Sequence, residues 1–121
     1  MRELAAVFRA LSDETRLQML GLLLREGELC VCDFVEVLSV TQSKASRHLR
    51  YLRAAGLLED ERDGLIMNYR EPESPDPELA AVHALLRELL GAYALPDVRP
   101  QLVQLRAARA EGRAPAAGGV A

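Results

Sequence analysis

The feature that most constrains the fold is a three-residue turn between two short segments with helical patterning. In the first segment, 31–38, apolar residues recur at the spacing of one helix face, at Val31, Phe34, Val35 and Leu38. The turn, 39–41, reads Ser-Val-Thr, and Thr41 can cap a second helix that runs to about residue 55. Gly56 then suits the left-handed position that ends a helix. Two helices joined by so short a turn predict a helix-turn-helix.

Two further helices are predicted before this unit. Residues 4–11 carry an apolar stripe at Leu4, Val7, Phe8 and Leu11. We predict that Ser12 caps the next helix and that Asp13 and Glu14 place negative charge in its first turn. Leucines face inward along this second helix, and Gly27 ends it.

A β-hairpin is predicted directly after the helix-turn-helix. Residues 57–62 and 65–70 flank Asp63-Gly64, the dipeptide best suited to a type I′ turn. A hairpin in this place predicts a wing.

A fifth helix is predicted after an extended connection that contains Pro72, Pro75 and Pro77. Its apolar stripe runs from Leu79 to Tyr93 and is wider than one small domain can cover, so we expect a homodimer. The predicted interface residues come from the first and the fifth helix: Leu4, Val7, Phe8, Leu79, Val82, Leu86, Leu89, Leu90 and Tyr93.

The formal net charge is −3, but the charge is unevenly distributed along the chain. Residues 42–56 contain no Asp or Glu and have a local charge of +4, from Lys44, Arg47, Arg50 and Arg53. A basic helix on an acidic body is compatible with DNA binding, because counterion release depends on the cations that meet phosphates. A solvated helix face explains the same charges equally well at this level.

The composition indicates one mainly α-helical domain with a small hairpin, since half of the 121 residues are hydrophobic and only five are aromatic. We expect a winged helix-turn-helix domain for DNA binding and dimerisation at 1–95, a C-terminal extension at 96–109 with a short helix from 101, and a disordered tail at 110–121. Apolar runs are too short to span a membrane and the N-terminus lacks a signal peptide's apolar stretch, so we expect a cytoplasmic protein. In that compartment a structural disulfide between Cys30 and Cys32 is less expected than a metal-binding, reactive or inert thiol pair.

Three motifs, in this order along residues 4–93, resemble the ArsR/SmtB family of winged-helix metalloregulatory repressors. They are Ser-Asp-Glu-Thr-Arg-Leu at 12–17, Glu-Leu-Cys-Val-Cys-Asp at 28–33, and Ser-Lys-Ala-Ser-Arg-His-Leu at 43–49 with Ala-Gly-Leu at 55–57. The resemblance implies a homodimer that occupies operator DNA and leaves it when an inducer binds, and it implies a regulator rather than an enzyme.

The resemblance makes the helix at 41–55 the recognition helix, which enters the major groove. Base edges are expected to be contacted by Gln42, Ser43, Ser46 and Arg47, and phosphates by Lys44 and Arg50. His48 can contact a phosphate or make only a local hydrogen bond. On the hairpin the candidates for backbone or minor-groove contact are Arg62, Asn68 and Arg70. The hairpin tip, Asp-Gly-Leu at 63–65, departs from the family pattern, in which a basic residue is common.

The Cys-Val-Cys triplet beside Asp33 resembles the arsenic-responsive branch, in which Cys30 and Cys32 would bind As(III) or Sb(III) as thiolates, the soft ligands that suit such ions. In that branch a third cysteine often follows the second by three residues, and here Val35 holds that position. Inorganic As(III) prefers three sulfurs, so hydroxide, halide or a cellular thiol would complete it, whereas methylarsenite needs only two. No constitutive cofactor is expected.

The spacing of the two cysteines also suggests how binding is transmitted. Residues i and i+2 of a helix do not face each other, so Cys30 and Cys32 cannot both hold one ion while both are helical. We therefore expect ligation to unwind the first turn of the helix at 31–38, to shift Val31, and to misplace the recognition helix relative to its dimer mate.

Other interpretations stay open at this point. The thiol pair could make the protein a redox-sensing repressor, or could pack as inert side chains. A thiol oxidoreductase or arsenate reductase has no phosphate loop to support it, and an adaptor that binds proteins leaves the basic helix unexplained. A zinc site on the fifth helix is not expected, because His83 has only Asp76 seven residues before it and Arg87 four after it.

Overall fold

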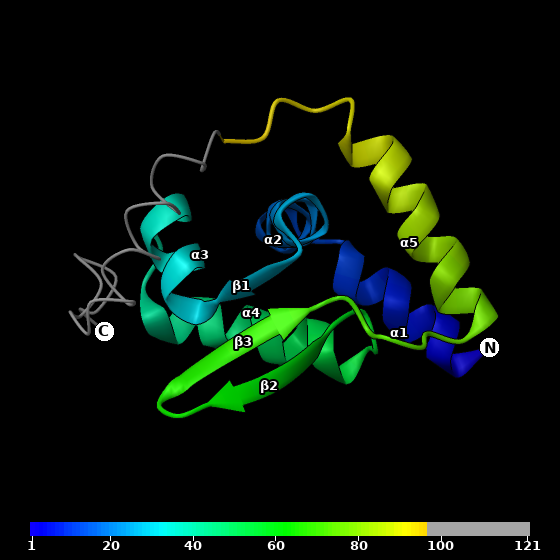
Figure 1. Cartoon of the computed structure of the whole chain (residues 1–121). Helices are drawn as coiled ribbons and strands as arrows, with labels where there is room; N and C mark the ends of the chain where they lie inside the picture. The colour runs from blue at the N-terminus through cyan, green and yellow to red at the C-terminus, as the bar shows by residue number, and fades with distance from the viewer. Residues whose placement is uncertain (97–121) are drawn as a thin grey trace.

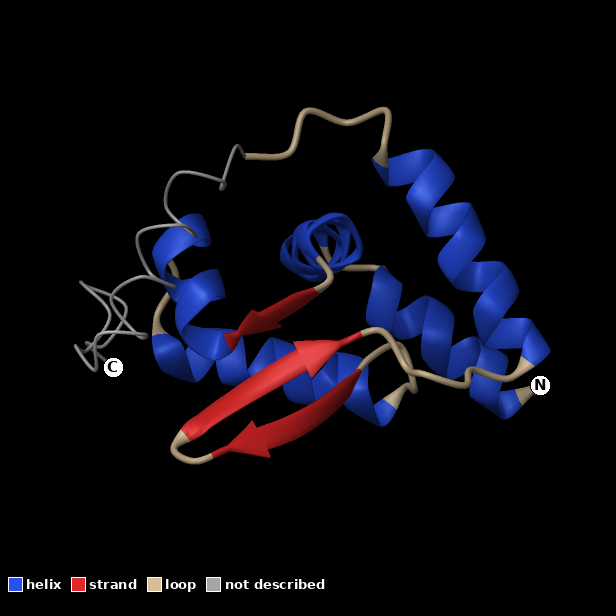
Figure 2. Cartoon of the chain, viewed as in Figure 1, coloured by secondary structure: helices blue, strands red, loops and turns tan. Residues whose placement is uncertain are grey.

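The computed structural model describes residues 1–96, which form five α-helices and one three-stranded antiparallel sheet (Figure 1). In chain order the elements are α1 (Arg2–Leu11), α2 (Glu14–Glu26), β1 (Glu28–Cys30), α3 (Val31–Leu38), α4 (Gln42–Ala54), β2 (Glu59–Asp63), β3 (Ile66–Arg70) and α5 (Pro77–Leu90). Figure 2 shows the three strands gathered on one side of the helices. The short helix and the tail that the sequence predicts after residue 96 lie outside the described residues.

The core surrounds α2, which Figure 1 shows end on between α3 and α5. Its buried side chains include Met19, Leu20, Leu22 and Leu23, so α2 is apolar on more than one face. Phe34 of α3 and Leu49 and Leu52 of α4 complete the centre of the core. The predominantly helical fold expected from the composition is confirmed.

The helix-turn-helix is confirmed in α3, the turn and α4. Thr41 caps α4, because its side chain accepts a hydrogen bond from the Lys44 N–H at 3.1 Å. Ser39 ends α3 in a left-handed conformation with φ 54°, and Gly56 has φ 81° after α4.

The cap of α2 differs from the prediction. The Asp13 carboxylate accepts the Arg16 N–H at 2.9 Å, and this hydrogen bond lowers the pKa of Asp13. Ser12 instead donates its hydroxyl to the Arg9 carbonyl at 2.8 Å, at the end of α1. Both residue types are good caps, so the sequence alone does not decide between two neighbours.

The sheet contains a strand that the sequence pattern did not predict. β1 is only three residues long, too short to show an alternating pattern, and it exists because it pairs with β3. The strand order is β1-β3-β2, which makes the hairpin part of a larger sheet. In this register Cys30 lies opposite Asn68, so the cysteine motif is an edge of the wing sheet.

The hairpin turn is displaced by one residue from the predicted Asp63-Gly64 position. Asp63 pairs with Ile66, which leaves Gly64 and Leu65 as the two loop residues. Gly64 has φ 64°, but Leu65 is not among the residues with positive φ, as a type I′ turn requires of both loop residues. Glycine at the first loop position is typical of a type II′ turn. Arg62 therefore pairs with Met67 instead of Leu65, so each cross-strand partner moves by two residues while the same side chains still share a face.

α5 begins earlier and ends earlier than predicted. Asp76 caps the helix by accepting the Leu79 N–H at 2.8 Å, and Pro77 is the first residue of the helix rather than part of the extended connection. The helix ends at Leu90, so Tyr93 lies beyond it. The chain then passes back over α2, where the Arg25 guanidinium donates to the Pro96 carbonyl at 2.9 Å.

Candidate DNA-binding surface and cysteine sensor

The two faces of α4 differ sharply in character. Ala45, Leu49 and Leu52 are completely buried and hold the helix on the core. The opposite face is exposed and carries the predicted DNA contacts Gln42, Ser43, Lys44, Arg47 and Arg50, with Ser46 half-buried at its border. This surface presents cations and hydrogen-bonding side chains together, the combination that contacts phosphates and base edges.

His48 lies on the inner side of α4, at 9% exposure. Its Nδ1 is 3.3 Å from Nη1 of Arg16 and 4.0 Å from the Asp13 carboxylate, both at the start of α2. Burial lowers the pKa of His48, and Arg16 and two basic neighbours on α4 add to this against the opposing effect of Asp13. The ring therefore joins α4 to α2, and we leave it out of the DNA-contacting set.

Arg16 of α2 contacts both α1 and α4, a role that the sequence pattern did not reveal. Its Nε donates to the Ala10 carbonyl at 2.6 Å, at the end of α1. Its guanidinium lies over the Tyr51 ring of α4, 4.2 Å from the centroid, in addition to its contact with His48. Arg16 thus positions the recognition helix, and no sequence signal could have identified partners 32 and 35 residues away.

The wing offers fewer available cations than its sequence suggests. Arg70 makes ion pairs with Glu59 at 3.1 Å and Glu61 at 3.4 Å. Partial burial opposes its charge, but these carboxylates outweigh that effect and raise the pKa of Arg70. Asn68 is half-buried on the central strand, whereas Arg62 is exposed. The sheet therefore engages Arg70 within the protein, and we leave Arg70 out of the DNA-contacting set.

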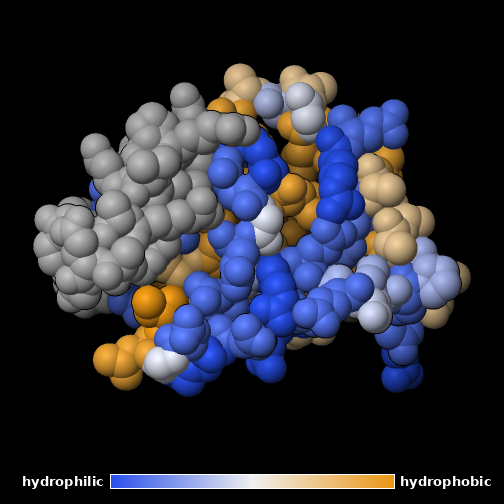
Figure 3. Space-filling view, in the orientation of Figure 1, coloured by the Kyte–Doolittle hydropathy of each residue, from blue (hydrophilic) through white to orange (hydrophobic). Residues whose placement is uncertain are grey.

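The surface of the wing is mainly hydrophilic, with apolar residues at its tip (Figure 3). Leu65 at the tip is 99% exposed, and β2 carries the carboxylates Glu59, Asp60, Glu61 and Asp63. An acidic strand with an apolar tip is poorly suited to phosphate contact.

Cys30 and Cys32 form a disulfide, with their Cα atoms 5.3 Å apart. The sequence favoured a thiol pair over a disulfide, and in this respect the prediction is wrong. The structure also corrects the expectation that the first turn of the helix must unwind for both sulfurs to meet, because Cys30 is the N-cap of α3 with extended backbone angles of φ −93° and ψ 168°. An extended residue followed by the first turn of a helix brings the two sulfurs together without unwinding α3.

Asp33 completes the cysteine site. Its carboxylate is buried at 2% exposure and accepts the Cys30 N–H at 2.8 Å, which fixes the N-terminus of α3. The two sulfurs and a carboxylate oxygen lie within 4.8 Å of one another. Val35, at the position of a third cysteine, is 8% exposed and packs in the core. In the reduced state this site can offer two adjacent thiolates to a soft ion.

Exposed apolar side chains are present on α1, on α5 and just beyond α5. Phe8 is 56% exposed, Leu89 51% and Tyr93 70%. The half-buried members of the predicted interface are Leu4, Leu79, Val82 and Leu90. Val7 and Leu86 are buried in the protein's own core and offer no surface to a second subunit.

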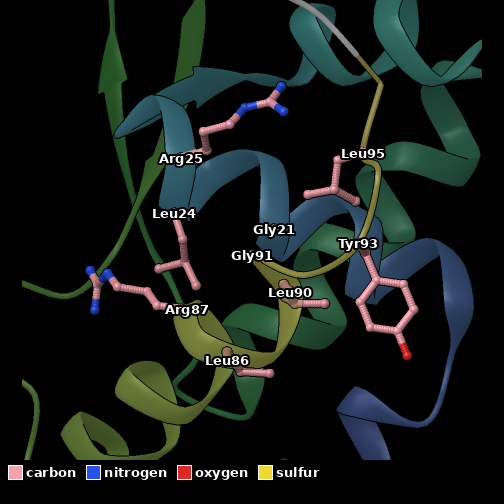
Figure 4. Close-up of a pocket in the computed structure, with 9 residues that line it drawn as sticks. All are labelled: Gly21, Leu24, Arg25, Leu86, Arg87, Leu90, Gly91, Tyr93 and Leu95. Carbon is pink, nitrogen blue, oxygen red and sulfur yellow. The ribbon is translucent and has the colours of Figure 1, made fainter.

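A small cavity of about 290 Å³ lies between α2, α5 and the segment after α5 (Figure 4). Leucines form much of its lining, together with Gly21, Gly91 and Tyr93. Its two arginines are engaged within the chain, Arg25 with the Pro96 carbonyl and Arg87 with Glu71. We assign no ligand to this cavity.

None of the helices in residues 1–96 is long and apolar enough to cross a membrane.

A helix-turn-helix with an exposed basic second helix, followed by a β-hairpin, defines a winged helix DNA-binding protein. Residues 13–60 match the sequence family described as "Bacterial regulatory protein, arsR family".

Two relatives from Pseudomonas putida KT2440 also indicate this family. The arsenic resistance transcriptional regulator ArsR1 is 49% identical over 79 residues, which is 62% of each chain. ArsR2, with the same description, is 45% identical over 87 residues, covering 71% of this chain and 72% of that protein. The chain belongs to the ArsR family of bacterial regulatory proteins.

The match spans less than two thirds of ArsR1. Among solved structures, the fold is similar to the solution structure of the homodimeric winged helix-turn-helix DNA-binding domain of Mb0332 from Mycobacterium bovis, a possible ArsR-family transcriptional regulator. The two are 29% identical, with a TM-score of 0.62 and coverage of 76% of this chain and 82% of that one. This likeness confirms the winged helix-turn-helix fold.

Proposed function

We propose that this protein is a cytoplasmic homodimeric repressor that binds operator DNA and is released when trivalent arsenic or antimony binds the reduced Cys30–Cys32 pair. One observation carries the proposal. The two sulfurs meet at the N-terminus of α3, the first helix of the same helix-turn-helix whose second helix presents the basic surface. A ligand at the sulfurs therefore acts on the DNA-binding unit itself.

The proposed DNA contacts lie on the exposed face of α4. Gln42, Ser43, Ser46 and Arg47 read base edges near the N-terminus of the helix, and Lys44 and Arg50 contact phosphates. Arg62 is the contact that we propose for the wing, because it is exposed on β2. A homodimer brings two α4 helices to two half-sites, and the apolar side chains of Phe8, Leu89 and Tyr93 support such an interface.

The proposed inducer is set by the number of available thiolates. Cys30 and Cys32 supply two thiolates, and the position of a third cysteine is held by Val35, which packs in the core. Methylarsenite is saturated by two sulfurs, so it fits the pair directly. Inorganic As(III) or Sb(III) needs a third ligand, which hydroxide or a cellular thiol can provide. Because Cys30 already lies outside the helix, ligand binding does not need to unwind α3.

Fluorescence anisotropy on the upstream palindrome tests the proposal. Reduced wild type is titrated with arsenite, antimonite, methylarsenite, Zn(II), Cd(II) and peroxide, alongside Cys30→Ser and Cys32→Ser. We expect release by the trivalent arsenic or antimony compounds in wild type and no release in either variant. Equal release of the Cys30→Ser variant by methylarsenite would contradict the assignment of the sensor.

The disulfide favours a second candidate function, a thiol redox-sensing repressor. Here hydrogen peroxide accepts two electrons from the thiol pair, its oxygen–oxygen bond breaks, it takes up the two thiol protons to leave as two molecules of water, and the sulfur–sulfur bond forms. We expect peroxide alone to release DNA with loss of two titratable thiols, and a thiol reductant to restore binding. If peroxide forms the disulfide without changing DNA affinity, the disulfide is not a signal.

A further inference from the structure

Arg70 lies on the central strand of the sheet and is surrounded by carboxylates. Its Nε is 3.1 Å from Glu59 and its Nη1 is 3.4 Å from Glu61, both on β2. The same Nη1 is 4.0 Å from Glu28 on β1, and Nη2 is 3.9 Å from Glu73 in the connection to α5. The side chain is only 24% exposed. One guanidinium thus links β1 to β2 across β3.

The strand register places this ion-pair cluster next to the cysteine site. Arg70 lies directly opposite Glu28 on one side and Glu59 on the other. Side chains two residues apart share a face of a sheet, so the next row on this face consists of Cys30, Asn68 and Glu61. Arg70 contacts β1 at Glu28, two residues before Cys30. A displacement of Cys30 therefore acts close to this contact.

The far side of the sheet is connected to the recognition helix. Asp60 of β2 makes an ion pair with Arg53 in the last turn of α4, at 3.0 Å. The four residues between α4 and β2 include Leu57 and Leu58, which are both buried in the core. These contacts connect β2 to the C-terminal end of α4, so a movement of β2 also displaces that end of the helix.

We propose that Arg70 is a positioning residue that transmits the response of the cysteine pair through the sheet to the recognition helix. This inference rests on the proposed function, because it concerns how ligand binding at Cys30 and Cys32 weakens DNA binding. A three-residue strand such as β1 has few backbone hydrogen bonds to β3, so displacement of Cys30 could separate the two strands. The Glu28–Arg70 contact makes the sheet move as one body instead.

Two carboxylates near Arg70 provide a matched test. Glu28 and Glu73 lie at nearly equal distances from Arg70 and are both exposed, but only Glu28 belongs to the strand that carries Cys30. The measured quantity is the operator Kd with saturating methylarsenite divided by the Kd without it, for the reduced full-length chain. We expect Glu28→Gln to lower this ratio about 2- to 30-fold, the range found for residues that carry coupling between sites. Glu73→Gln should keep the wild-type ratio.

Methylarsenite affinity, measured separately, should be nearly the same in both variants and in wild type. A second pair of variants tests the arginine itself: Arg70→Met should lower the ratio at least as much as Glu28→Gln, and Arg87→Met, which removes an ion pair with Glu71 outside the sheet, should not. Equal ratios for Glu28→Gln and wild type would overturn the inference, as would an equal loss in Glu73→Gln. If methylarsenite fails to release wild type, the proposed inducer itself is wrong, and this inference falls with it.

Discussion

The recognition helix and the wing both carry arginines, but they make them available in opposite ways. On α4 the exposed face from 42 to 50 contains no acidic residue, so Lys44, Arg47 and Arg50 face solvent without acidic neighbours on their own helix. On the wing each arginine lies among carboxylates on β2, and Arg70 contacts Glu59 and Glu61 directly. The formal charge of an element therefore does not show how many of its cations are available to contact phosphates.

The difference matters because DNA affinity follows the cations that displace counterions from phosphates. A cation already paired with carboxylates in the protein has to give up those contacts first. We therefore expect α4 to supply most of the DNA affinity, with the wing contributing little.

The largest effect is expected for Arg47→Ala. Arg47 is exposed on the first half of α4, where a bidentate contact to a guanine is worth about 1–3 kcal/mol. Fluorescence anisotropy with the operator should show this loss. The same change at the wing, Arg62→Ala, serves as the control and should have a much smaller effect. Equal losses at the two positions would remove the contrast between α4 and the wing.

A smaller effect is expected on the salt dependence of binding. Lys44→Met should reduce the slope of log K against log salt concentration by about 0.9, the value for one phosphate contact. Arg70→Met removes the same charge but should leave the slope unchanged, because Arg70 is engaged with Glu59 and Glu61. A reduced slope in Arg70→Met would return Arg70 to the set of DNA contacts.

The sequence predicted the parts of this contrast that depend on local patterns. The helix-turn-helix followed from the spacing of apolar residues and from the caps Thr41 and Gly56, whose effects act within a few residues. The inward position of His48 was not predictable, because its partner Arg16 is 32 residues away. The pairing of Arg70 with Glu59 was not predictable because it depends on the register of the hairpin, which the sequence placed differently.

The cysteine site shows the same limit. The Cys-Val-Cys motif could be found in the sequence, but the extended conformation of Cys30, which brings the sulfurs together without unwinding α3, could not. Strand β1 makes it extended, and β1 itself exists only through pairing with β3, about 40 residues further along the chain. The turn of the hairpin was misplaced by one residue for a related reason, because strand register is set by pairing across the whole sheet.

A weaker effect is expected from the acidic residues of the wing. Asp63 is exposed next to the hairpin turn, so Asp63→Asn should increase operator affinity slightly, by about 0.2–0.5 kcal/mol, in the range of exposed charges. The gain should disappear in high salt. Glu78→Gln removes the same charge from α5 and should show no gain. Weaker binding in Asp63→Asn would mean that the wing takes part in DNA binding through this carboxylate.

The smallest effect concerns the inner face of α4, where His48 lies against Arg16 and Asp13. The pKa of His48 is lowered, mainly by burial, so the folded protein favours the neutral ring and the unfolded chain binds a proton more readily. The stability that this provides is present above the ordinary histidine pKa of about 6.5 and is lost as the pH falls through the lower pKa of the folded state. Urea unfolding between pH 7.5 and 5 should show this decrease in wild type and a smaller decrease in His48→Gln. If the two proteins lose stability equally over that range, the pKa of His48 is not lowered by burial against α2 in the folded protein.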